Sequence, residues 1–158
     1  MLIESGKLNL GDDISKYLPE FKRAQVWKGE EGIAPAPPVT VKDLLCHTSG
    51  YSYGNIGIQP IDEAHRENGS LLETVPLSRF YRQATLIPMA FDPGESWLYG
   101  TSTDLLGAVV ERVSGLTLDQ FFQSQIFTPL GMVDTGFVIP EDKRARLAVA
   151  YDSNKKGH

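Results

Sequence analysis

Three helix-start signals, each a threonine with a polar partner three residues later, constrain the fold of this chain more than any other feature. They are Thr40 with Asp43, Thr101 with Asp104, and Thr117 with Gln120. In a capping box, two such side chains bond free backbone N–H groups at the first turn of a helix. Apolar residues at helical spacing follow each signal until Gly50, Gly115 or Pro129 stops them. The sequence therefore predicts helices that begin near residues 40, 101 and 117.

Two weaker patterns predict further helices. One is a short helix that begins at Asp12 or Asp13, carries apolar residues over 14–18 and ends at Pro19. The other covers 71–84, with Leu77, Phe80 and Tyr81 at helical spacing. The expected fold is therefore mostly α-helical, with at most marginal strands.

We expect no complete helix or strand in the segments between these helices or at either end of the chain. Residues 22–38 mix charge, Gly and Pro, and we expect a surface loop there. Residues 51–69 are Gly-rich without periodicity, which predicts a long ordered loop. The chain starts with Met1–Gly6, typical of the last turn of a helix closed by Gly6, and stops in polar residues after 147–150. We therefore expect a single partial domain over residues 1–158.

Composition excludes several classes of function. The chain has 15 Lys and Arg against 20 Asp and Glu, a net charge of −5, whereas a nucleic-acid binder needs a basic stripe. The apolar run 105–110 is far shorter than a membrane span, and the first residues do not have the pattern of a signal peptide. A single cysteine, Cys46, excludes an internal disulfide, and the histidines show no metal-binding spacing. We expect neither a metal nor an organic cofactor.

Two short motifs match serine-hydrolase patterns. Residues 50–54 read G-x-S-x-G around Ser52, but the strand-turn-helix frame of a nucleophile elbow is absent. The later histidines are His65, in a charged segment, and terminal His158, so we interpret the motif as a Gly-rich turn and keep Ser52 as an alternative nucleophile. Residues 153–156 read S-x-x-K in a polar tail, where nothing desolvates the lysine, and we interpret that match as chance.

Tyr99 is the strongest candidate for chemistry. It lies two residues before Thr101, so its phenol is expected beside the positive end of the following helix, where phenolate is favoured. A tyrosine in that position can serve as a general base. Trp97 and Tyr99 alternate, however, and an equal alternative is that both are ordinary core aromatics.

Four collinear segments together resemble the serine β-lactamase-like superfamily, which includes class C β-lactamases, DD-peptidases and family VIII carboxylesterases. These segments are Leu2–Pro19, Val39–Gly50, Trp97–Gly107 and Phe127–Phe137. The resemblance implies that the chain is the helical lobe of the α/β fold of this superfamily, lacking most of its antiparallel sheet. It also implies an acyl-serine mechanism, with the S-x-x-K serine upstream of residue 1.

The resemblance implies roles for individual residues. Tyr99 matches the catalytic tyrosine of the Y-x-N motif, and Thr101 stands where that motif has asparagine. Trp97, Thr101, Tyr53 and Ser52 are then expected to bind substrate. The spacing from Tyr99 to Gly107 is more similar to the esterase subgroup than to the β-lactamases.

The leading hypothesis is an esterase acting on short-chain carboxylic esters. The alternatives are a β-lactamase or D-amino-acid peptidase of the same fold, a non-catalytic fragment or binding module, and a hydrolase that uses Ser52. The expected partner is a small-molecule ester or amide. Because the resemblance leaves out the sheet, we also expect self-association through exposed apolar surface.

Overall fold

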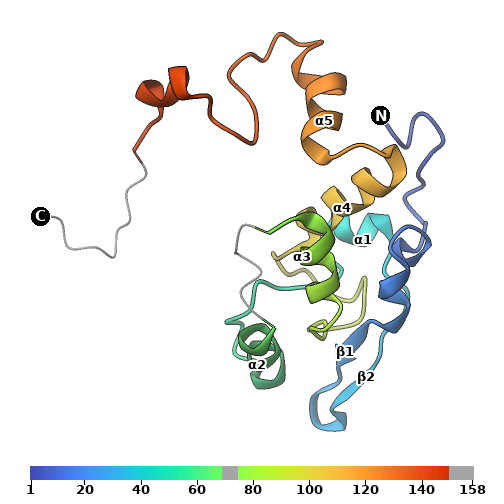
Figure 1. Cartoon of the computed structure of the whole chain (residues 1–158). Helices are drawn as coiled ribbons and strands as arrows, with labels where there is room; N and C mark the ends of the chain where they lie inside the picture. Colours follow the sequence, from blue (N-terminus) through green and yellow to red (C-terminus); the bar gives the residue numbers. More distant parts are fainter. Residues whose placement is uncertain (69–74, 150–158) are drawn as a thin grey trace, which may run out of the picture. The chain divides into compact units, whose positions relative to one another are not determined.

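A computed structural model describes residues 1–68 and 75–149 of the chain (Figure 1). The described residues belong to two compact units, Met1–Leu118 and Asp119–His158. Each unit is described separately below.

The first unit is mostly helical. Its α-helices are α1 (Val41–Leu45), α2 (Gln59–Glu67), α3 (Leu77–Ala84) and α4 (Ser102–Ser114). Short 3₁₀ helices cover Ile14–Lys16, Pro19–Arg23 and Gly29–Glu31. Strands β1 (Gln25–Trp27) and β2 (Ile33–Pro35) form an antiparallel hairpin, drawn in blue in Figure 1, in which Val26 pairs with Ala34.

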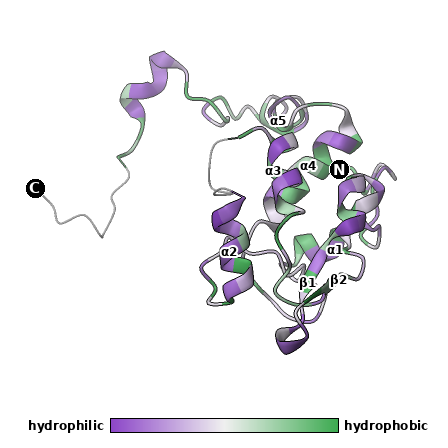
Figure 2. Ribbon diagram, turned by 60° about the horizontal axis from the view of Figure 1, so that its bottom comes forward, coloured by the Kyte–Doolittle hydropathy of each residue, from purple (hydrophilic) through white to green (hydrophobic). Residues whose placement is uncertain are grey.

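The core of the first unit gathers around α4. Both α1 and α3 pack against this helix, which buries Leu105 and Val109 completely. The core continues through Leu44 of α1 and through Ile14 and Val26 of the preceding segment, none of which is exposed. Helix α2 adds one apolar side, and Figure 2 shows hydrophobic and hydrophilic residues side by side on it. Burial of these side chains is the main force that holds the short helices together.

Several predicted local structures are confirmed. Thr40 and Asp43 form both hydrogen bonds of a capping box, and α1 begins at the next residue. Asp13 caps the short helix at Ile14, because its carboxylate accepts a hydrogen bond from the Ser15 N–H at 2.8 Å. Gly6 has φ +71°, the left-handed conformation expected of a residue that closes a helical turn. The mostly helical fold is likewise confirmed.

Two predicted loops contain regular structure instead. Residues 22–38 hold the β1–β2 hairpin, which the mixed composition of that segment concealed. Residues 51–69 hold α2, whose buried side presents only Ile61 and His65. Ile61 and His65 do have helical spacing, but one apolar residue and one histidine are too weak a pattern to predict a helix in a Gly-rich segment, so tertiary burial selects it. The predicted helix over 71–84 is described only from residue 75, where α3 follows Pro76; residues 71–74 lie outside the described part.

The capping box predicted at Thr101 and Asp104 is wrong. Thr101 does precede α4, but its side chain makes no capping hydrogen bond and is fully buried. The Asp104 carboxylate instead accepts a hydrogen bond from the Tyr53 hydroxyl, 51 positions earlier in the chain. A long-range partner has therefore replaced the local one.

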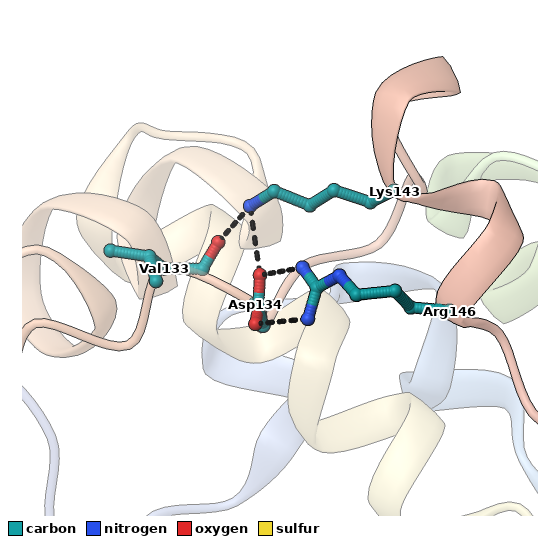
Figure 3. A network of polar contacts seen from close by, with 4 residues as sticks. All are labelled: Val133, Asp134, Lys143 and Arg146. Atoms are coloured by element: carbon teal, nitrogen blue, oxygen red, sulfur yellow. Dashed lines mark hydrogen bonds and ion pairs between the residues drawn. The ribbon is translucent and has the colours of Figure 1, made fainter.

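Helix α5 (Leu118–Phe122) begins at the last residue of the first unit, continues in the second unit as a π-helix over Gln123–Phe127 and ends before Pro129, as expected. A 3₁₀ helix follows at Glu141–Arg146. Two side chains of this 3₁₀ helix bind the Asp134 carboxylate (Figure 3). Arg146 donates two hydrogen bonds to it, at 2.7 and 2.8 Å, and the Lys143 Nζ atom lies 3.0 Å from its Oδ1 atom. The bonds from Arg146, followed by those from Lys143, hold the pKa of Asp134 well below its usual range.

Candidate active site

Four aromatic side chains gather where the turn after α1 meets the segment before α4. They are His47, Tyr53, Trp97 and Tyr99, and we call them the aromatic cluster. The Tyr99 ring centroid lies 4.9 Å from that of His47 and 5.9 Å from that of Tyr53, and the rings of His47 and Trp97 are 6.3 Å apart. Trp97 is 64% exposed and Tyr99 is 62% exposed, so the alternative that they are core aromatics is wrong.

Backbone contacts fix the segment that carries Trp97 and Tyr99. The Leu98 N–H donates to the His47 carbonyl at 2.9 Å, and the Gly94 N–H donates to the Thr48 carbonyl at 2.8 Å. Gly100 packs against the chain itself: a Cβ atom there would lie 2.1 Å from the Tyr51 carbonyl oxygen. Only glycine permits that approach, and Tyr99 is therefore held next to a closely packed backbone crossing.

Tyr53 is tied to α4. Its hydroxyl donates to the Asp104 carboxylate at 2.9 Å. Burial first, and then this bond to an anion, raises the pKa of Tyr53 to about 12. Tyr53 therefore stays protonated at neutral pH and can orient a neighbour, but it is not a base.

Ser52 lies behind the cluster rather than in it. Its side chain is only 3% exposed, and its Oγ is 3.2 Å from Nε2 of His65 on the buried side of α2. The Gly54 N–H also donates to this Oγ, at 3.2 Å. Asp62, the acid of α2 whose charge acts on His65, uses both carboxylate oxygens to accept backbone N–H groups. The pair therefore lacks both access and the third member of a Ser-His-Asp triad from Asp62.

Thr101 and Ser102 are buried at the start of α4. The Thr101 Oγ1 has no hydrogen-bond partner among the described residues, and the side chain is not exposed. Ser102 and Ser49 share a hydrogen bond of 2.8 Å between their hydroxyl groups. This bond links the start of α4 to the turn that carries His47.

Comparison with known proteins decides the family. Residues 1–158 match the protein family described as Beta-lactamase. The chain belongs to the beta-lactamase family. It is 39% identical to lovastatin esterase of Penicillium rubens, an alignment that covers 92% of this chain and 38% of that protein. It is 37% identical to esterase EstB of Burkholderia gladioli, which covers 95% of this chain and 37% of that protein.

A solved structure agrees with the fold. EstCE1, titled a hydrolase with promiscuous acyltransferase activity, matches with a TM-score of 0.73 and 31% sequence identity. That match covers 90% of this chain and 36% of EstCE1. The chain thus spans somewhat more than a third of the length of these relatives. The resemblance inferred from the four sequence segments, including its partial extent, is confirmed.

The predicted site residues of this beta-lactamase family member separate into two groups. Tyr99, Trp97 and Tyr53 lie in the aromatic cluster, whereas the side chains of Ser52 and Thr101 are buried. Direct contact of those two with a ligand would require neighbouring segments to move.

The sequence did not identify His47 as a member of the site. Helix α1 ends earlier than Gly50, at Leu45, and His47 adopts φ +55° and packs against Tyr99. No local sequence pattern marks this left-handed turn, because the usual signal is a glycine and the nearest glycine is Gly50.

Two further features concern residues 1–68 and 75–149, the part of the chain that the structure describes. No group of three or more His, Cys, Asp or Glu side chains in this part could hold a metal ion. None of its helices has the length and apolar content that crossing a membrane demands.

Proposed function

We propose that the whole protein hydrolyses short-chain carboxylic esters through an acyl-serine intermediate. The nucleophilic serine lies outside these 158 residues, and Tyr99 shares the proton transfers. The observation that supports the proposal is the exposed ring of Tyr99, which packs against His47 and Tyr53 on a backbone segment fixed by hydrogen bonds. The similarity to lovastatin esterase and EstB supports an ester as the substrate.

The chemistry needs a group that moves a proton in both directions. A base takes the proton of the serine hydroxyl while the serine oxygen bonds to the ester carbonyl carbon. The bond from that carbon to the alcohol oxygen breaks, and the alcohol receives the proton. Water then repeats the sequence on the acyl-serine, which releases the carboxylic acid and restores the serine. A phenol that is reachable from solvent, as Tyr99 is, suits both directions of transfer.

Trp97 supplies an apolar surface beside Tyr99. Its indole is largely exposed on the same segment and lies next to His47. A short acyl or alcohol group packed on this ring would be desolvated near the phenol. Tyr53, bound to Asp104 of α4, would support the ring of Tyr99. Thr101 and Ser52 would shape the backbone behind Tyr99.

A fluorophosphonate probe, which labels activated serines covalently, tests the assignment in the protein expressed from its full coding sequence. Mass spectrometry is expected to find the label on a serine outside residues 1–158, and Tyr99→Phe is expected to slow labelling. Ser52→Ala serves as the control and is expected to be labelled normally. A label on Ser52 itself would contradict the proposal and revive the alternative of a Ser52 nucleophile.

Substrate panels separate the remaining alternatives. The esterase proposal predicts turnover of p-nitrophenyl butyrate by the whole protein, without turnover of nitrocefin or D-Ala-D-Ala peptides. A β-lactamase or D-amino-acid peptidase predicts the latter two. The 158-residue chain alone is expected to give no more than trace turnover of any of them, because a tyrosine cannot carry the acyl group in place of the serine.

A further inference from the structure

The geometry points to His47 as the positioning residue for Tyr99: its imidazole ring fixes where the phenol lies. This inference rests on the proposed function of Tyr99 and adds a second residue to it. The two rings are the most closely approaching aromatic pair of the cluster, with centroids 4.9 Å apart and planes inclined at 34°. No other residue in the cluster contacts both Tyr99 and Trp97.

The backbone of His47 is unusual in a way that suggests a function for the side chain. Its φ of +55° lies in the left-handed region, and among the described residues only Asn55 shares this feature outside glycine. Glycine would adopt this conformation at less cost than histidine. Strained residues persist where the surrounding structure fixes them, and they cluster at functional sites. The side chain, rather than the backbone, is therefore the reason for a histidine here.

Packing rather than hydrogen bonding holds the imidazole. Its Nδ1 atom is buried and has no hydrogen-bond partner among residues 1–68 and 75–149. The ring instead packs against Tyr99 and Trp97, while the His47 carbonyl accepts the Leu98 N–H between them. One residue thus fixes both the backbone and the rings of the segment that carries Tyr99.

Tyr53, the second aromatic neighbour of Tyr99, does not depend on His47 for its position. Tyr53 approaches Tyr99 at 5.9 Å and is held by Asp104 of α4. Because Tyr99 is mostly exposed, few other contacts restrict its ring. Loss of the imidazole therefore removes the closest restraint while leaving the fold and Tyr53 in place.

The first test measures the ring itself, in the 158-residue chain with 3-fluorotyrosine at position 99. The fluorine NMR signal of the wild type is expected to be shifted from that of free 3-fluorotyrosine, because the imidazole restricts the ring. His47→Gly and His47→Asn both suit the left-handed backbone, and each is expected to move the signal toward the free value. Asn55→Gly relieves the same type of backbone strain on an exposed residue and is the matched control, expected to keep the wild-type signal.

The second test measures turnover in the protein expressed from its full coding sequence. His47→Gly and His47→Asn are expected to lower kcat by ~10–100-fold, the scale of a misplaced catalytic group, while KM changes little. Asn55→Gly is expected to keep wild-type kcat. A purely structural role of His47 would instead lower the melting temperature without this separation of kcat from KM.

Two results would overturn the inference: a fluorine signal that both His47 variants leave unchanged, or wild-type kcat in both variants. Failure of the proposed function has a different signature. A Tyr99→Phe variant with wild-type turnover overturns the role of Tyr99, whereas an inactive Tyr99→Phe beside a fully active His47→Gly overturns only the role of His47.

Discussion

The Ser52–His65 pair places a titratable group in the interior of the first unit. His65 is 8% exposed, and this burial lowers its pKa, although the charge of Asp62 partly opposes the shift. The unfolded chain therefore binds more protons than the folded one once the pH falls below the ordinary histidine value of about 6.5. Stability is complete above that value and is lost as the pH falls toward the lowered pKa of His65.

We accordingly expect the free energy of unfolding to decrease from about pH 7 to pH 5 and the decrease to be smaller in His65→Gln, which cannot gain the proton. Denaturant titrations at several pH values measure it. Identical pH dependence in the two proteins would contradict the assignment of this acid sensitivity to His65.

Substitution of Gly100 should displace the backbone that carries Tyr99. A Cβ atom at this position would meet the Tyr51 carbonyl oxygen at 2.1 Å, and this main-chain oxygen cannot move aside as the end of a flexible side chain could. Gly100→Ala is expected to lower the free energy of unfolding by at least ~1–3 kcal/mol, the usual cost of overpacking.

Gly11→Ala is the matched control, because nothing lies within 4 Å of its added methyl group. Thermal unfolding of both variants provides the measurement. Equal stabilities for Gly100→Ala and Gly11→Ala would show that the crossing at Tyr51 is not as close as described.

At the scale of the elements, two threonines at helix starts should respond oppositely to the same substitution. Thr40 caps α1 through its hydroxyl, so Thr40→Val should cost about 0.5–2 kcal/mol of unfolding free energy. The Thr101 hydroxyl is buried without a partner, so Thr101→Val keeps the shape and removes a desolvated polar group. Urea unfolding should therefore find Thr40→Val less stable than the wild type and Thr101→Val at least as stable. A loss in Thr101→Val as large as in Thr40→Val would restore a capping role for Thr101.

The helix starts also illustrate what the sequence could predict. At Thr40 the capping partner is three residues away, so local pattern and structure agree. At Thr101 the same pattern fails because Tyr53, distant in sequence, occupies Asp104. Helix α2 was not predicted for a similar reason: its buried side includes His65, whose partner Ser52 comes from another segment. Local signals predict an element well when its partners are local.

The candidate site follows the same rule. Tyr99 and Trp97 could be selected because they directly precede a predicted helix and match a family motif. The exposure of Tyr99 and Trp97 and the contact of the His47 ring could not be predicted, because both depend on a turn that brings residues 47 and 99 together. The left-handed backbone of His47 has no sequence signature of its own.

At the scale of the whole molecule, exposed apolar side chains are concentrated in the second unit. Within the described part of that unit, the most exposed are Leu130, Val133, Phe137, Val138, Leu147 and Val149. The core cluster of buried residues lies entirely within the first unit. The two units therefore differ in how completely they bury their apolar residues.

We expect the 158-residue chain to self-associate and to bind a hydrophobic dye, since exposed apolar patches of several hundred Å² promote association. A chain that ends at Leu118 is expected to do so less and to keep its cooperative unfolding. Sedimentation velocity and dye fluorescence measure these properties. A clean monomer without dye binding for the 158-residue chain would contradict the prediction of self-association.

Proton transfer by Tyr99 can be measured with the Tyr99→Phe variant of the protein expressed from its full coding sequence. The substitution keeps the ring contacts with His47 and Tyr53 and removes only the hydroxyl. We predict that the fold persists and that turnover of p-nitrophenyl butyrate falls by ~10²–10⁴-fold, as for loss of a positioned acid or base. Retention of most of the wild-type turnover at every pH tested would show that Tyr99 does not transfer protons.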